Sequence, residues 1–176
     1  EFLKGKHATL SDSRKVVSAL KGEWGATYNF NAAPGLVTKA DCEKLKHLLD
    51  GKCNGEADLK LPMSPSQLAQ ATMNPDIVSK LHRHFGIAFD SIILRRVEAV
   101  GECIGFHRDV SKRVLQVALN SDHEYCGGRL VFITEKGMES PMRLVGSATM
   151  HDNSIIHGVT QHQSGTRYSL FVLKTH

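Results

Sequence analysis

Two stretches of the chain carry side chains that can bind a metal ion. Residues 105–109 read Gly-Phe-His-Arg-Asp, which places His107 two positions before Asp109. On a β-strand, side chains two positions apart project from the same face, so both groups can reach one ion. A second imidazole, His157, lies at the end of a short apolar run that contains Ile155 and Ile156. These three polar side chains are the candidates for a metal site.

Two imidazoles and one carboxylate form a ligand set of known chemistry. Such a set leaves open positions on the ion and is typical of non-haem Fe(II) oxygenase sites. Arg167 and Ser169 follow ten and twelve residues after His157. They are two residues apart, so on a strand their side chains share one face. A guanidinium binds a carboxylate through paired hydrogen bonds and keeps its charge at working pH. The pattern therefore favours a carboxylate-bearing ligand near the metal.

The candidate motifs follow one another in a fixed order through the second half of the chain. They are His-x-Asp at 107–109, Val-Leu-Gln-Val-Ala-Leu-Asn at 114–120, Cys-Gly-Gly-Arg-Leu-Val-Phe at 126–132, His-Gly-Val at 157–159 and Gly-Thr-Arg-Tyr-Ser-Leu at 165–170. This set resembles the catalytic domain of 2-oxoglutarate/Fe(II)-dependent dioxygenases and is most similar to the prolyl 4-hydroxylase branch. The resemblance covers about half the chain, residues 90–174. His-x-Asp alone is a weak signal, whereas the ordered set is specific.

The resemblance implies a reaction and assigns roles to the residues. His107, Asp109 and His157 would bind Fe(II), while Arg167 and Ser169 would hold the distal carboxylate of 2-oxoglutarate. The enzyme would use O2 to hydroxylate an unactivated C–H bond, with decarboxylation of 2-oxoglutarate to succinate and ascorbate as a reductant. The expected substrate is a prolyl residue of a peptide or protein. Two alternatives are an oxygenase of the same fold that acts on a free amino acid or small metabolite, and a metal-binding jelly-roll module without turnover.

Some positions leave a choice or depart from the family pattern. His151, beside Asp152, competes with His157, and we prefer His157 because Gly158 and Val159 follow it and Arg167 lies ten residues away. The family commonly has a tyrosine about ten residues before His-x-Asp and another in the next strand, where this chain has Val97 and Val117. Six other histidines are interpreted as loop or surface residues: His82, His84, His123, His151, His162 and His176.

Composition limits the other function classes. The 176 residues allow one domain with a sizeable core, and 41% hydrophobic and 23% charged residues are ordinary for a globular protein. A net charge of +4, from 22 basic and 18 acidic residues, does not indicate a nucleic-acid surface. We expect no membrane segment, four reduced cysteines and a cytoplasmic or nuclear setting. The chain starts at Glu1 rather than methionine, so we expect this start to be a trimmed boundary.

Helices are predicted in the first half, 1–86, which would support a strand-rich core at 87–176. Cap residues and prolines place these helices at 14–21, at 39–50 after Thr38, after Ser64-Pro65, and from Asn74-Pro75 to Gly86. Trp24, Tyr28 and Phe30 alternate and form either core packing or a substrate-groove wall. Residues 51–62 are expected to be a loop, and together with 97–105 to contact a peptide substrate.

The second half changes to short strands separated by Gly, Asn and Asp turns. The expected strands are 89–97, 102–106, 114–120, 128–134, 142–144, 148–151, 154–157 and 167–173. Strands at this density are typical of a sandwich or barrel. Gly127-Gly128 is interpreted as a bend that allows close backbone approach. The family resemblance narrows the fold class to a mainly β, α+β protein with a double-stranded β-helix (jelly roll) and N-terminal helices packed outside.

Overall fold

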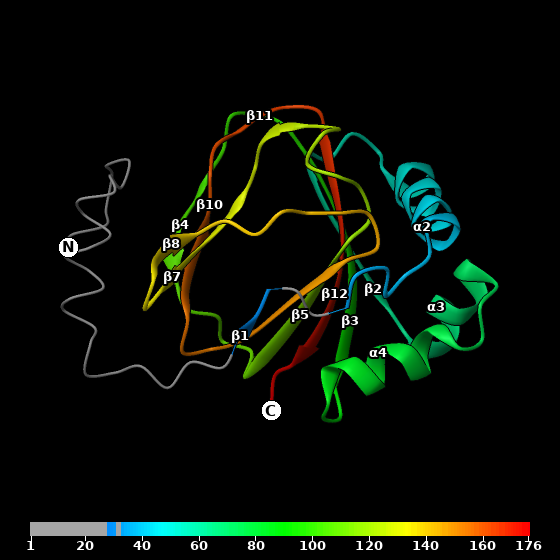
Figure 1. The fold of residues 1–176 in the computed structure, drawn as a ribbon. Coiled ribbons are helices and arrows are strands. Elements are labelled where there is room, and N and C mark those ends of the chain that lie inside the picture. Colours follow the sequence, from blue (N-terminus) through cyan, green and yellow to red (C-terminus); the bar gives the residue numbers. More distant parts are fainter. Residues whose placement is uncertain (1–27, 31–32) are drawn as a thin grey trace.

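Two antiparallel sheets face each other, and three helices cover the outside of the larger sheet (Figure 1). The computed structural model describes residues 28–30 and 33–176, so Trp24 and the helix predicted at 14–21 lie outside the described residues. The helices are α2 (Lys39–Lys52), α3 (Pro65–Thr72) and α4 (Ile77–Phe85). None of these helices is long and apolar enough to cross a membrane.

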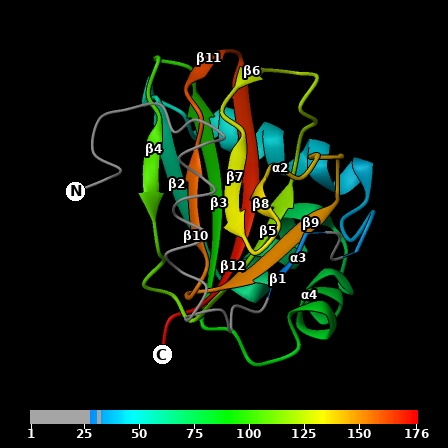
Figure 2. The same cartoon turned by 60° about the vertical axis from the view of Figure 1, so that its left-hand side comes forward.

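The large sheet has six strands in the order β1-β9-β5-β12-β3-β2. Their bounds are β1 (Tyr28–Asn29), β9 (Ala148–Asp152), β5 (Arg113–Ala118), β12 (Thr166–Lys174), β3 (Ser91–Glu98) and β2 (Asp58–Met63). The small sheet, in front in Figure 2, has the order β4-β10-β7-β8. Its bounds are β4 (Ile104–His107), β10 (Ile156–Val159), β7 (Leu130–Thr134) and β8 (Gly137–Glu139). A third pair, β6 (Cys126–Gly127) and β11 (His162–Ser164), lies at one end of the sandwich.

From β3 onward the chain passes back and forth between the sheets. β3, β5, β9 and β12 belong to the large sheet, whereas β4, β7, β8 and β10 belong to the small one. Strands of both sheets thereby coil together along the chain, which is the double-stranded β-helix expected from the sequence. The region up to residue 86 is not purely helical, because β1 and β2 add one strand to each edge of the large sheet.

The main core fills the space between the helices and the outer face of the large sheet. Along β12, Leu170 and Val172 are fully buried in it, while Arg167 and Ser169 alternate onto the opposite face. Leu45 of α2 is also fully buried in this core. The helices therefore cover the outer face, and the inner face remains available for polar groups. Burial of these apolar side chains is the dominant favourable term in folding.

A smaller apolar cluster lies between the sheets. Phe132 is fully buried in it, and Phe30 stacks on the Phe132 ring at 4.2 Å between ring centroids. Tyr28 stacks in turn on Phe30 at 4.7 Å. The predicted packing role is confirmed for Tyr28 and Phe30. The stack of Tyr28, Phe30 and Phe132 borders the inner face of the large sheet.

Local sequence signals explain where the helices begin. The Thr38 hydroxyl accepts a hydrogen bond from the Asp41 amide, and Ser64 forms a capping box with Gln67. The helix predicted from Asn74-Pro75 begins later, at Ile77, because the Asn74 side chain instead accepts a bond from the Asp76 amide. The helix expected to stop at Gly51 continues to Lys52.

Two sequence predictions need correction, and three short strands were missed. Residues 51–62 are not all loop, because 58–63 form β2, an edge strand that tolerates Pro62. No strand forms at 142–144, and the short strands β6, β8 and β11 were not predicted. All four cysteines are free thiols, as predicted.

The packing makes a stability prediction. Leu45→Ala should lower the free energy of unfolding by about 2–5 kcal/mol, since it leaves a cavity in the main core. Leu144→Ala is the matched control, because Leu144 is 51% exposed and surface changes usually stay within about 0.5 kcal/mol. Urea unfolding followed by circular dichroism measures both variants. Equal stability of the two proteins would contradict this placement of the core.

Candidate metal centre

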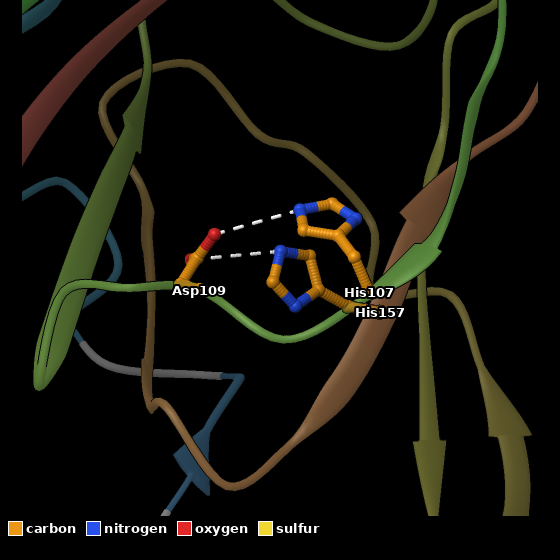
Figure 3. A group of neighbouring side chains, drawn as sticks. All are labelled: His107, Asp109 and His157. Carbon is orange, nitrogen blue, oxygen red and sulfur yellow. Dashed lines mark ion pairs between the residues drawn. The ribbon is translucent and has the colours of Figure 1, made fainter.

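The structure brings His107, Asp109 and His157 together at one end of the sandwich (Figure 3). β4 ends at His107, Asp109 follows two residues later, and β10 places His157 directly opposite His107. The Nε2 atom of His107 lies 3.5 Å from Oδ1 of Asp109, and Nε2 of His157 lies 3.6 Å from Oδ2. The candidate ligand atoms all lie within 4.8 Å of one another. One ion can therefore contact all three side chains.

The three ligands differ in exposure. The side chain of His157 is 7% exposed, that of Asp109 26% and that of His107 40%. The site thus opens to solvent on the His107 side and is closed on the His157 side, where Phe132 lies 5.6 Å from the His157 ring between centroids. A bound ion would keep an accessible face toward the opening.

The protonation of the site suits a cation. Burial, followed by the nearby His151 ring, lowers the pKa of His157 to about 4, so this imidazole is neutral at neutral pH. Burial opposes ionisation of Asp109, but the hydrogen bond to His151 and the other imidazoles lower its pKa below the usual value. The Nδ1 atom of His107 lies 2.9 Å from the Gly105 carbonyl oxygen. An Nδ1–H donor to that carbonyl leaves Nε2 free for a metal.

A third histidine corrects the sequence interpretation. His151 was expected in a loop or on the surface, but it is 2% exposed, and its Nε2 atom lies 3.1 Å from Oδ2 of Asp109. The alternation of β9 explains this position, because Ala148 packs in the main core while Thr149 and His151 face the interior of the sandwich. His151 thereby contacts the carboxylate of Asp109, whereas the cluster of candidate ligand atoms within 4.8 Å consists of His107, Asp109 and His157. The alternating polar residues 149 and 151 were the available signal.

His162 requires a second correction. It is 4% exposed instead of lying on the surface, and neither ring nitrogen has a hydrogen-bond partner among the described residues. Gly127 and Gly128 make this position possible, because both have positive φ and an added Cβ at Gly127 would lie 1.9 Å from the Gln161 carbonyl oxygen. The predicted close backbone approach at this bend is therefore present. The other histidines interpreted as surface residues are exposed: His82, His84, His123 and His176.

Arg167 and Ser169 lie on the inner face of the large sheet, as their spacing predicted. Arg167 is 5% exposed and Ser169 2%, and Gln116 of β5 donates to the Ser169 hydroxyl at 3.3 Å. The Nε and Nη2 atoms of Arg167 are buried without a partner among the described residues. Burial and the nearby Arg143 lower the pKa of Arg167 to about 9. A buried, unpaired guanidinium is unfavourable, so this site has the chemistry of an anion receptor.

Arg143 was not among the predicted site residues. It lies in the segment between β8 and β9, is 5% exposed, and its Nη2 atom donates to the Ser169 hydroxyl at 3.1 Å and to the Tyr168 carbonyl at 3.0 Å. Residues 142–144 were interpreted as a strand, and no role was assigned to Arg143. The alternating hydropathy of Met142-Arg143-Leu144 gave no signal of a buried charge.

The two positions where the family commonly has tyrosine differ from each other. Val117 is fully buried in the main core on the outer face, so its side chain points away from the candidate site. Val97 pairs with Arg167 across β3 and β12 and lines a small pocket beside it. This pocket has a volume of about 70 Å³ and also contacts His162 and Val159. It connects the arginine end of the interior with the surface.

Comparisons with known proteins show similarity in fold. No family profile and no curated protein sequence matches the chain. Solved structures do match: the viral collagen prolyl hydroxylase of Paramecium Bursaria Chlorella virus-1 with 2OG has a TM-score of 0.60 at 13% identity, covering 86% of this chain and 96% of that one. HygX from Streptomyces hygroscopicus, with nickel and 2-oxoglutarate bound, has a TM-score of 0.60 at 10% identity, covering 91% and 85%.

A third structure contains a peptide. It is a prolyl hydroxylase from Trichoplax adhaerens in complex with a fragment of the hypoxia inducible factor oxygen degradation domain, with a TM-score of 0.57 at 12% identity, covering 97% and 93%. The structural neighbours are thus 2-oxoglutarate-dependent oxygenases, prolyl hydroxylases among them. At these identities the similarity establishes the double-stranded β-helix fold, and the role of each residue depends on the geometry above.

The geometry predicts one divalent metal ion per chain. His107→Ala and His157→Ala should each weaken binding by more than the roughly 10- to 100-fold that the loss of an outer partner causes. His123→Ala is the matched control, because His123 is exposed and outside the site. Anaerobic calorimetry with Fe(II), or the absorption of Co(II), measures the affinity. Unchanged affinity in His157→Ala would exclude this ligand set.

The contact between His151 and Asp109 makes a separate prediction. His151→Phe removes the donor to Oδ2 and should weaken metal affinity roughly 10- to 100-fold. His151→Gln retains a donor and should lose less. If His151→Phe binds metal as tightly as the unaltered protein, the contact does not orient the carboxylate. A loss as large as that of His157→Ala would instead make His151 a direct ligand.

Proposed function

We propose that this protein is a 2-oxoglutarate- and Fe(II)-dependent dioxygenase that hydroxylates an unactivated C–H bond. One observation carries the proposal: two imidazoles and a carboxylate converge within 4.8 Å in the same polar interior that holds the unpaired, buried guanidinium of Arg167. The first group has the donor set of a ferrous site with open positions. The second binds a carboxylate, so together they suit a metal and a dicarboxylic co-substrate.

The residues have separate tasks in this proposal. Bound Fe(II) supplies the oxidation by O2 that is coupled to the conversion of 2-oxoglutarate to succinate and carbon dioxide. His107, Asp109 and His157 hold the ion, and His151 orients the carboxylate of Asp109. Arg167 and Ser169 bind the distal carboxylate of the co-substrate. The apolar cluster around Phe132 limits water on the closed side of the metal centre.

A prolyl residue of a peptide or protein is the substrate class we propose. Val110, which follows Asp109 in the chain, is an apolar side chain that is 93% exposed. An exposed apolar side chain beside the metal centre suits a peptide with an apolar target residue. The neighbours that are prolyl hydroxylases, one of them with a peptide, support the same class. Residues 97–105 were predicted to contact a peptide. They contribute Val100, Cys103 and Ile104 to the pocket beside Arg167.

A small-molecule substrate is the second candidate. A neighbour of the same fold, the non-heme alpha ketoglutarate dependent epimerase SnoN from nogalamycin biosynthesis, supports this candidate. An oxygenase of this fold that acts on a free amino acid or small metabolite would use the same metal and co-substrate sites. The two candidates differ in substrate size rather than in chemistry.

Turnover tests the proposal. With Fe(II), 2-oxoglutarate, O2 and ascorbate, a peptide library should produce succinate and gain one oxygen atom on proline, detected by mass spectrometry. Arg167→Ala should raise the 2-oxoglutarate requirement by roughly 10- to 150-fold, equivalent to a charge-assisted hydrogen bond of about 1.5–3 kcal/mol. Arg83→Gln is the matched control, because Arg83 is exposed on α4.

The other outcomes identify the alternatives. Succinate formed with free amino acids or metabolites, but not with peptides, would favour the small-molecule oxygenase. Metal binding without succinate from any substrate would leave a metal-binding jelly-roll module without turnover. Full turnover in His157→Ala would overturn the assignment of the metal ligands.

A further inference from the structure

Two arginines are buried close together at the end of the interior where β12 begins. Arg143 and Arg167 are each 5% exposed, and each comes from a different part of the chain. Burial and the charge of Arg143 lower the pKa of Arg167, while the nearby Tyr125 partly offsets this effect. Two guanidiniums in mutual repulsion and away from water are unfavourable unless an anion lies between or beside them.

The acidic groups nearby do not neutralise both charges. Asp122 is 8% exposed, and its oxygens accept bonds from the Tyr125 hydroxyl at 2.8 Å and from the backbone amide of Arg143 at 3.0 Å. Among the described residues, neither guanidinium forms an ion pair within 4.0 Å. Asp58, Glu98 and Glu102 line the pocket beside Arg167, but Asp58 pairs with Arg95 and Glu98 with Arg96. The carboxylate of a ligand bound at the two arginines would offset the positive charge that Asp122 leaves unbalanced.

The unused hydrogen-bond donors indicate that these arginines are not only structural. Nη2 of Arg143 is engaged with the Ser169 hydroxyl and the Tyr168 carbonyl, but its Nε atom is buried without a partner among the described residues. The same holds for Nε and Nη2 of Arg167. A purely structural arginine would normally have its buried donors satisfied. Both side chains therefore retain donors for a ligand.

A pocket beside Arg167 gives a ligand access to this part of the interior. The pocket that opens beside Arg167 is lined by His162, whose ring nitrogens are likewise buried without partners among the described residues. The end of the interior that holds the two arginines is thus connected with solvent and has further unused polar atoms. A closed, structural charge cluster would not have this access.

We propose that Arg143 is a second anion-binding residue, which binds the distal carboxylate of a dicarboxylic 2-oxo acid together with Arg167. The identity of the ligand rests on the proposed function, whereas the presence of a two-arginine carboxylate site rests on burial, charge balance and unused donors. Through its bond to the Ser169 hydroxyl, Arg143 also positions that group beside Arg167. The site selects ligands that carry a second carboxylate over 2-oxo acids without one.

Ligand selectivity tests the role of Arg143. Calorimetry with Mn(II) in place of Fe(II) compares 2-oxoglutarate with 2-oxobutyrate, which lacks the distal carboxylate. In Arg143→Gln, 2-oxoglutarate should bind roughly 10- to 150-fold more weakly, as expected for loss of a charge-assisted hydrogen bond, while 2-oxobutyrate should bind as before. Arg83→Gln should match the unaltered protein. Equal weakening of both ligands, or of neither, would overturn the proposal.

A conservative variant covers the case in which Arg143→Gln does not fold. Arg143→Lys keeps the charge but replaces the planar donor group with a single ammonium. It should fold and should bind 2-oxoglutarate more weakly than the unaltered protein, with 2-oxobutyrate again unaffected. Unchanged binding of 2-oxoglutarate in a folded Arg143→Lys protein, together with failure of Arg143→Gln to fold, would assign Arg143 a structural role only.

A metal-free measurement separates this proposal from the proposed function. Glutarate has two carboxylates and no 2-oxo group, so its binding does not depend on chelation of a metal. It should raise the Tm of the metal-free protein, butyrate should raise it less, and Arg143→Gln should lose the difference. If this holds while no succinate is ever formed, the carboxylate site stands and the oxygenase proposal fails. If succinate is formed but glutarate and butyrate raise the Tm equally, the oxygenase proposal stands and the two-arginine carboxylate site fails.

Discussion

The two faces of the large sheet have opposite chemistry, and the positions of His151, Arg167 and Ser169 depend on this difference. Toward the helices, the strands present Leu94, Leu115 and Leu170 to the main core. Toward the small sheet, the same strands present polar side chains such as Gln116 and Ser169. Because the helices supply most of the apolar burial, the interior of the sandwich does not have to be a conventional core. A buried polar chamber is stable only because that burial occurs elsewhere.

The chamber has a different function at each end. At one end, the imidazoles of His107 and His157 and the carboxylate of Asp109 offer lone pairs to a cation. At the other end, two guanidiniums offer donors to an anion. A molecule with a chelating group and a distal carboxylate matches both ends. This opposition of charge within the sandwich is a stronger argument for a dicarboxylic co-substrate than either end alone, because each end by itself is compatible with many ligands.

The sequence alone identified the three candidate ligands that the structure brings together, but it missed residues around them, for a physical reason. His107, Asp109 and His157 could be identified because a His-x-Asp motif followed by a second histidine and an arginine, in this order, is an unusual combination. His151 and Arg143 were assigned to ordinary surface or strand positions, because burial of polar side chains is rare and an alternating pattern does not tell which face is polar. Alternation predicted the strand at 148–151, for example, but not that its polar face, which carries His151, would be buried.

Strand boundaries show the same limit. The helices at 39–52 and 65–72 were predictable from Thr38 and Ser64, since capping is a local interaction. β2 was not, because an edge strand that contains Pro62 resembles a loop and forms only through pairing with β3. β6 and β11 are also defined by long-range pairing rather than by local preference.

The alternation of β12 has an evolutionary consequence. Leu170 and Val172 must fit the apolar core under the helices, whereas Arg167 and Ser169 must fit the polar interior of the sandwich, although all four residues belong to one strand. The two selective pressures act on separate faces and can be met independently. An insertion or deletion of one residue within the strand would exchange the faces and violate both at once. This strand can therefore change residue by residue through substitution, but its length within the sheet is under strong selection.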